Sequence, residues 1–133
     1  MSLIQCNEIC KSFGEKIALD HVSVTMEKGR IFGLLGPNGS GKTTLIRIIN
    51  RITIPNSGEV LFDGRPITQR DVEKIGYMPE ERGLYRKMKV GEQALFLARL
   101  KGMSRRDAEN ELKKWFVRFG IESWWNKKVE ELS

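Results

Sequence analysis

The chain has 133 residues, 40% of them hydrophobic and 30% charged, and its 23 basic against 17 acidic residues give a net charge of +6. This length fits one domain or a piece of one, and two cysteines, Cys6 and Cys10, are too few for a disulfide-stapled secreted domain. No apolar run reaches the about 18–20 residues that a membrane span needs, which excludes a membrane-spanning helix as the basis of the fold.

The first 52 residues predict an antiparallel β element, a buried strand and a helix, in that order. Residues 3–9 and 22–26 alternate between apolar and polar, as half-buried strands do, and "SFGEK" between them favours a turn. Residues 30–36, "RIFGLLG", are almost continuously apolar, which is typical of a central strand covered on both faces. Apolar residues recur at helical spacing over 42–52, so this segment is expected to be an amphipathic helix.

The middle of the chain predicts more β-structure. Residues 59–62 are expected to form a short strand, and the Asp-Gly pair at 63–64 favours a hairpin turn after it. A polar segment, 68–74, is expected to be helical. It leads to residues 75–79, "IGYMP", which read as a short apolar strand halted by proline.

The last third of the chain is expected to be helical. Apolar residues over 90–100 favour a helix that ends at the glycine of "KGM". A second helix is expected to begin at Ser104, whose hydroxyl can cap it with Asp107 three residues on, and to run to Gly120. Pairs of basic residues here stand among acids, which is typical of solvated helix faces.

The glycine-rich loop at 36–44, "GPNGSGKTT", carries the clearest chemistry. Gly36, Gly41, Lys42 and Thr43 satisfy the pattern G-x-x-x-x-G-K-[ST]. Glycines allow backbone N–H groups to converge on a phosphate, and the following helix presents its free N–H groups and positive dipole end to the anion. Lys42 adds a positive charge for the β- and γ-phosphates, and the Thr43 hydroxyl completes an oxygen site for Mg²⁺. The candidate nucleotide-binding residues are Gly36, Pro37, Asn38, Gly39, Ser40, Gly41, Lys42, Thr43 and Thr44.

Longer stretches around this loop carry a family resemblance. "GLLGPNGSGKTTL" and the turn "PNSGEV" before "FDG", with the surrounding residues 10–64 and 75–103, resemble the start of the nucleotide-binding domain of an ATP-binding cassette (ABC) transporter. "PEERGLY" is similar to bacterial sodium-extrusion and drug-export ATPase subunits. The resemblance implies an α/β fold of the P-loop NTPase class, with an antiparallel β subdomain, a strand–loop–helix unit and the start of a helical subdomain. It implies a β-rich ATP-binding part over 1–89 and a helical part over 90–133.

The resemblance also implies residue roles outside the loop. Phe13 falls where the family carries an aromatic that stacks on adenine, and the alternative is that it packs the hairpin. Glu80 takes the place of the family's usual glutamine, which reaches Mg²⁺ and the attacking water. A carboxylate can bind Mg²⁺ but cannot donate a hydrogen bond when ionised, so Glu80 is a catalytic and metal candidate whose alternative is a surface acid. His21 lies upstream of the loop, unlike the family's catalytic histidine, and is expected to be an ordinary strand residue. Cys6 and Cys10 are spaced poorly for zinc.

The C-terminal end departs from the family pattern. Leu132 and Ser133 look like the first two letters of the family's signature motif, and no apolar strand ending in "DE" follows the loop to supply a general base. We therefore expect an N-terminal fragment of a longer ATPase, which binds nucleotide but lacks the catalytic second half.

The function implied is that of an ATPase subunit that couples ATP binding and hydrolysis to transport, with export favoured. ATP and Mg²⁺ are the implied cofactors. The implied partners are transmembrane subunits, which dock on residues 81–104, and a second ATPase subunit in a homodimer or heterodimer. The implied location is cytoplasmic, peripheral on the inner face of the membrane. The alternative is a soluble ABC ATPase acting on nucleic acid or ribosomes, although nucleic acid is the less favoured partner. A P-loop kinase or GTPase is disfavoured, since no N-K-x-D motif is present.

Overall fold

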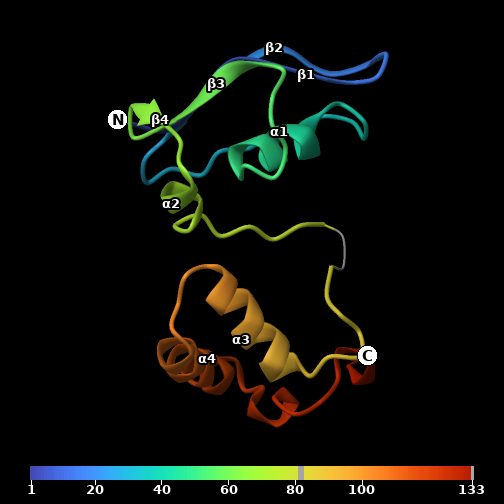
Figure 1. The fold of residues 1–133 in the computed structure, drawn as a ribbon, viewed down its shortest axis with the longest axis vertical. Coiled ribbons are helices and arrows are strands. Elements are labelled where there is room, and N and C mark those ends of the chain that lie inside the picture. The colour runs from blue at the N-terminus through green and yellow to red at the C-terminus, as the bar shows by residue number, and fades with distance from the viewer. Residues whose placement is uncertain (81–82, 133) are drawn as a thin grey trace. The chain divides into compact units, whose positions relative to one another are not determined.

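A computed structural model of the chain describes residues 1–80 and 83–132. Its contacts divide the chain into two units, Met1–Tyr77 and Met78–Ser133. Figure 1 shows a sheet with helices in the first unit and a group of helices in the second. The division expected from the sequence at residues 89 and 90 stays a prediction about the organisation of the whole nucleotide-binding domain.

The sheet of the first unit is antiparallel and has the strand order β2-β1-β3-β4. The predicted strands at 3–9 and 22–26 are confirmed and extend further than predicted, and the predicted hairpin around the Asp-Gly turn joins the last two strands. The strands are β1 (Ser2–Phe13), β2 (Lys16–Glu27), β3 (Ser57–Phe62) and β4 (Arg65–Pro66).

The pairing of β1 with β2 is interrupted by a β-bulge. Ile9 pairs with Val22 and Lys11 pairs with Leu19, so a single residue of β1, Cys10, faces two residues of β2. One of these two, His21, has a φ of 49°. A bulge of this kind bends the strand and re-aims the side chains at the irregularity.

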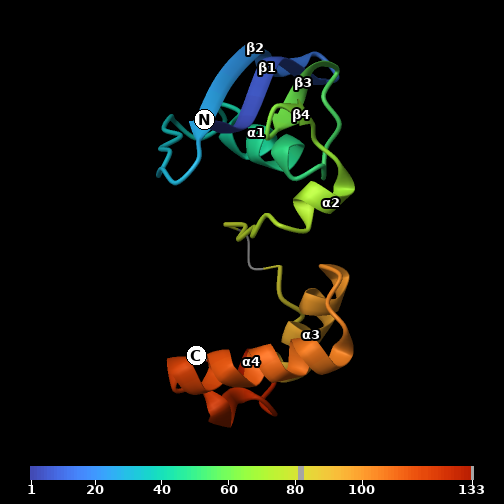
Figure 2. The same ribbon diagram turned by 90° about the vertical axis from the view of Figure 1, so that its left-hand side faces the viewer.

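Helix α1 (Lys42–Ile49) covers one face of this sheet (Figure 2). Its buried residues Leu45, Ile48 and Ile49 pack in the core with buried residues of the strands, which are Cys6, Ile9, Leu19 and Val60. The helix ends three residues earlier than the predicted 42–52, because Asn50 forms the C-cap and its side-chain Nδ2 donates to the carbonyl of Ile46 at 2.9 Å.

The prediction of two strands from apolar runs is wrong for the described residues. Neither 30–36 nor 75–79 is a strand, and Ile31 and Leu35 are almost fully exposed. A strand exists through hydrogen bonds to neighbours, and the antiparallel sheet among residues 1–80 and 83–132 does not extend to these segments. Within these two runs, Leu34 and Ile75 are the residues that pack against the core.

A short helix, α2 (Gln69–Val72), is held by a buried carboxylate. Asp71 accepts hydrogen bonds from the N–H and hydroxyl of Thr68, both at 2.8 Å, and pairs with both terminal nitrogens of Arg65 at 2.7 and 2.8 Å. The Arg65 guanidinium and the Thr68 N–H hold the pKa of the Asp71 carboxyl well below its usual range. The predicted helical segment at 68–74 is confirmed over Gln69–Val72, and this network fixes its start.

The second unit contains α3 (Val90–Leu100) and α4 (Arg105–Phe119), with short 3₁₀ turns at Glu122–Trp124 and Val129–Glu131. The Ser104 cap is confirmed, because its hydroxyl accepts from the Asp107 N–H at 3.1 Å, and Gly120 ends α4 with a φ of 67°. Trp125 packs edge-on against Phe116. No helix in the described part of the chain is both long and apolar enough to cross a membrane.

The indole of Trp125 also lies directly on the backbone of α3. A Cβ added at Gly91 would lie 2.7 Å from Nε1 of this ring and closer still to two of its carbons. The Gly91 N–H donates to the carbonyl of Trp125 at 3.0 Å, and the Val90 N–H donates to that of Lys127 at 2.9 Å. The start of α3 is thus fixed to the segment after α4.

Candidate functional site

The glycine-rich loop leads directly into α1 and rests on β2. Gly41 forms the N-cap of the helix with a φ of 96°, a conformation that favours glycine. A Cβ added there would lie 2.9 Å from Cδ2 of Leu19 and closer still to the carbonyl oxygen of Ala18. Only a residue without a side chain fits at this position, so the loop is held against the strand by close backbone contact. The sequence did not predict the contribution of Ala18 and Leu19, because no motif marks them.

The Lys42 side chain folds back over the loop. Its ammonium donates to the carbonyl oxygen of Gly36, to that of Pro37 at 2.8 Å and to the Ser40 hydroxyl at 3.3 Å. The sequence pattern places a cation in this loop, and among residues 1–80 and 83–132 its hydrogen-bond partners are neutral oxygens. No acidic residue stands in the first turn of α1. The charge of Lys42 is therefore not neutralised by a nearby carboxylate of the loop or of this turn.

Several backbone N–H groups of the loop are free to bind a ligand. The Ser40 N–H donates to Pro37 at 3.2 Å, and the first helical hydrogen bond runs from Leu45 to Gly41 at 3.0 Å. Within the described residues, no hydrogen bond takes up the N–H groups of Gly39, Gly41, Lys42, Thr43 and Thr44. Consecutive free N–H groups at a helix start, next to a lysine, form an anion-binding cradle. The residues present therefore fit a phosphate group.

Thr43 provides an oxygen at the same place. It lies in the first turn of α1 and is exposed. A hydroxyl there can join the oxygen ligands of a divalent cation whose other ligands come from phosphate and water. The loop thus brings the predicted residues from Gly36 to Thr44 together at the start of α1.

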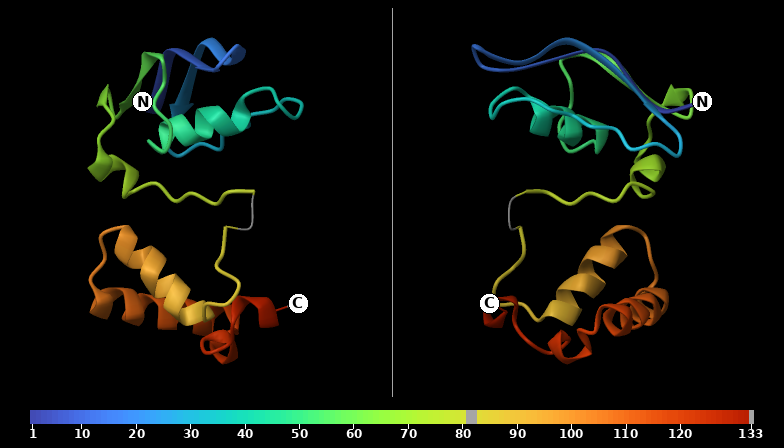
Figure 3. Two further views of the ribbon diagram at one scale, coloured as in Figure 1. Left: turned by 45° about the vertical axis from the view of Figure 1, so that its right-hand side comes forward. Right: turned by 180° about the vertical axis from the view of Figure 1, so that it is seen from behind.

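Phe13 lies at the end of β1, at the tip of the β1–β2 hairpin. Its side chain is 53% exposed, and the Lys11 ammonium lies 5.2 Å from the ring centroid. Figure 3 shows the hairpin tip and the glycine-rich loop at the same end of the first unit. An exposed ring at this end is available to a base, and burial of the whole ring within the hairpin is not observed.

The remaining predicted residues lie in the second unit. Glu80 is exposed, and its role toward Mg²⁺ and water stays a prediction. Leu132 is half-buried after the last 3₁₀ turn, and Ser133 lies outside the described residues.

Comparison with known proteins decides the family. The family model for ABC transporters matches residues 19–133. The chain belongs to the ABC transporter family. This ABC protein is 47% identical to the ABC transporter ATP-binding protein YhaQ of Bacillus subtilis over 98% of its own length and 44% of the relative's. It thus spans less than half the length of that relative.

Further relatives confirm the resemblance predicted from the loop. The ABC chain is 34% identical over 99% of its length to the spermidine/putrescine import ATP-binding protein PotA of Bacteroides fragilis, covering 29% of that protein. It is 31% identical over 77% of its length to the lantibiotic transport ATP-binding protein SrtF of Streptococcus pyogenes, covering 44%. An ABC transporter ATP-binding protein from Pyrococcus furiosus has the same fold, with a TM-score of 0.75 and 30% identity over 99% of this chain and 64% of that structure. The fold class of an ABC ATPase is confirmed.

Proposed function

We propose that this ABC chain binds Mg·ATP through residues 36–44 and is part of a subunit that powers transport. The observation that carries the proposal is the row of N–H groups at the start of α1 that no hydrogen bond takes up within the described residues, next to the Lys42 ammonium, which contacts neutral oxygens. An anion as dense as a triphosphate satisfies these N–H groups and the lysine together.

Each loop residue has a role in this proposal. The backbone from Gly36 through Pro37, Asn38, Gly39, Ser40 and Gly41 wraps the phosphates. Lys42 leaves its loop acceptors to bind the β- and γ-phosphates, and Thr43 binds Mg²⁺ through its hydroxyl while the Thr44 N–H adds a donor. Phe13 stacks on the adenine ring, and Glu80 provides a carboxylate toward Mg²⁺ and water.

The whole subunit, by this proposal, hydrolyses ATP, pairs with a second ATPase subunit and docks on transmembrane subunits at the inner face of the membrane. Export is the direction we propose. It is supported by the resemblance of "PEERGLY" to export ATPases, whereas the relative PotA is named for import.

The docking part of the proposal is supported by the segment before α3. Gln93, which is 4% exposed, accepts at Oε1 from the Tyr85 N–H at 2.9 Å and donates from Nε2 to the Tyr85 carbonyl at 3.4 Å. These bonds hold the backbone of Tyr85 while the side chains of Leu84 and Tyr85 remain more than half exposed. A rigid backbone that presents exposed apolar side chains suits binding to a partner helix.

Titration calorimetry of Mg·ATP with the Lys42→Ala variant tests the proposal. Loss of a charge-assisted hydrogen bond is worth about 1.5–3 kcal/mol, so the affinity should fall by about 10- to 100-fold. Lys28→Ala is the matched control, because Lys28 is an exposed lysine of the same unit outside the loop. Equal affinities for the wild type, Lys42→Ala and the control would overturn the proposed site.

A further inference from the structure

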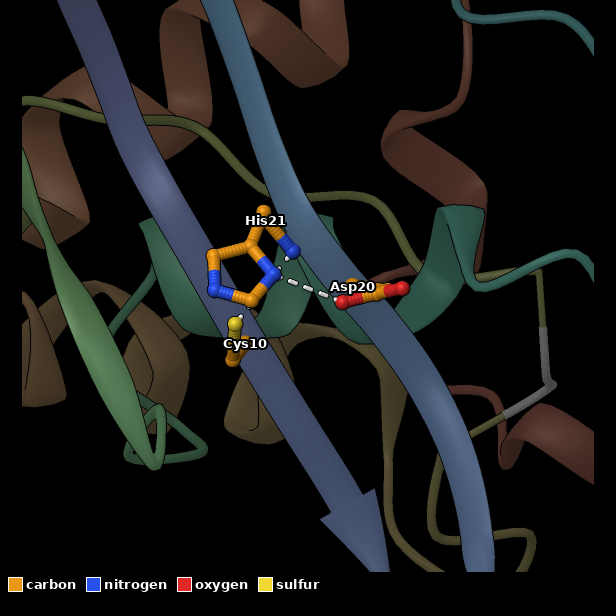
Figure 4. A group of neighbouring side chains, drawn as sticks. All are labelled: Cys10, Asp20 and His21. Atoms are coloured by element: carbon orange, nitrogen blue, oxygen red, sulfur yellow. Dashed lines mark hydrogen bonds and ion pairs between the residues drawn. The ribbon is translucent and has the colours of Figure 1, made fainter.

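We propose that Cys10, Asp20 and His21 form a binding site for a borderline-soft divalent cation such as Zn²⁺ or Co²⁺. The site lies on the β1–β2 hairpin (Figure 4) and shares no residue with the glycine-rich loop. One ligand atom from each of the three residues lies within 4.8 Å of the other two. This proposal does not depend on nucleotide binding.

The β-bulge creates this cluster. Asp20 and His21 are consecutive, and consecutive strand residues ordinarily point to opposite faces of a sheet. Here both lie opposite Cys10, between the pairs Ile9–Val22 and Lys11–Leu19, and His21 has a φ of 49°. Figure 4 shows the sulfur and the carboxylate beside the same imidazole ring. The extra residue of the bulge therefore brings three different donors together.

Two hydrogen bonds already fix the arrangement without a metal ion. The His21 backbone N–H donates to Sγ of Cys10 at 3.2 Å, so the sulfur is held beside the histidine. Nδ1 of His21 lies 2.7 Å from Oδ1 of Asp20. This hydrogen bond orients the imidazole while no ion is bound, and on binding the Asp20 carboxylate turns from the ring to the metal ion.

The donor set selects the class of cation. Sulfur with imidazole and carboxylate suits Zn²⁺ and Co²⁺, whereas Mg²⁺ and Ca²⁺ prefer oxygen ligands throughout. Zinc–ligand bonds of about 2.0–2.3 Å place tetrahedral ligands about 3.5 Å apart. Nδ1 of His21 and Oδ1 of Asp20, which are 2.7 Å apart, must therefore separate. Because both side chains are exposed, they can rotate to the required spacing. Water fills the fourth position, and the Cys10 thiol releases its proton on binding.

The sequence contains an internal control for this proposal. Cys6 lies on the same strand, but it is 1% exposed in the core, and burial raises the pKa of its thiol to about 11. A buried thiol that resists ionisation is a poor metal ligand. Substitution of Cys6 therefore removes one thiol from the protein without touching the cluster.

The test is a titration of the full chain with Co²⁺, followed by the thiolate-to-cobalt charge-transfer band in the near ultraviolet. We expect one Co²⁺ per chain, displaced by Zn²⁺. The band should be lost in Cys10→Ser and kept in Cys6→Ala. His21→Asn, which tolerates the positive φ, and Asp20→Asn should each raise the dissociation constant by at least about tenfold. Absence of the band at excess Co²⁺, or a band that survives Cys10→Ser and disappears in Cys6→Ala, would overturn the proposal.

A second measurement needs no variant and so does not depend on the folding of one. Zn²⁺ should slow the alkylation of Cys10 by iodoacetamide in the wild-type chain by at least about tenfold, read by mass spectrometry of the peptide that contains it. The rate at Cys6 should not change. Equal rates at Cys10 with and without Zn²⁺ would refute the site.

Discussion

Replacing Gly41 with alanine should destabilise the first unit far more than the same change at Gly39, two residues earlier in the loop. Both glycines have a positive φ, of 96° and 81°, so both variants bear backbone strain of about 1–3 kcal/mol. The two variants differ in the space available to the new Cβ. The new Cβ at residue 41 would meet the Ala18 carbonyl and Leu19, whereas nothing lies within 4 Å of the Cβ position at residue 39.

The expected difference follows from that contact. A clash with the backbone destabilises the Gly41→Ala variant by a further about 1–3 kcal/mol. In both variants alanine restricts the unfolded chain, which stabilises the fold by about 0.4–1 kcal/mol. Gly39→Ala should therefore lose about 0–2.5 kcal/mol of unfolding free energy, and Gly41→Ala about 1–3 kcal/mol more than that. Urea unfolding followed by far-ultraviolet circular dichroism, with hydrogen exchange of β1 amides to report the first unit, measures both. The reasoning is refuted if the two variants unfold at the same urea concentration.

The other predictions concern adenine binding and acid stability. Phe13→Ala should weaken ATP binding by about 1–3 kcal/mol and leave inorganic triphosphate binding unchanged in calorimetry; an equal loss for both ligands would exclude stacking. The pKa of Asp71 is lowered in the fold by Arg65 and Thr68, so its contribution to stability is present above the unfolded pKa of about 3.9 and is lost as the pH falls through the folded value. The urea midpoint of Asp71→Asn should be lower than that of the wild type at pH 7 and should change less between about pH 5 and pH 2. A wild-type pH profile in Asp71→Asn would contradict the assignment.

Local signals in the sequence predicted much of this structure. The loop pattern ending in Lys42, the Asp-Gly turn at 63–64 and the Ser104 cap each depend on residues a few positions apart, and all three are found. The wrong strands at 30–36 and 75–79 show the limit of such signals. An apolar run indicates that a segment suits a buried strand, but the neighbours that would pair with it are distant in sequence.

The two candidate sites also differ in how far local sequence signals predict them. The predicted phosphate-binding residues are contiguous, so a motif contains nearly all of them, and the supporting contact of Gly41 with Ala18 and Leu19 depends on the fold. Cys10, Asp20 and His21 come together only because β2 has one extra residue opposite β1. A bulge shifts register without leaving a signature in hydrophobic periodicity, so the spacing of the cysteines pointed away from a metal site.

The contact between Gly91 and Trp125 makes these two positions dependent on each other under substitution. Any side chain at residue 91 would overlap the indole, so an enlarged residue there can be accepted only with a smaller one at residue 125. A smaller residue at 125 would in turn remove the ring that packs on Phe116, leaving a cavity beside α4. The two positions should therefore change together or not at all when this helical unit is redesigned, and the effects of single and double substitutions there should be strongly non-additive.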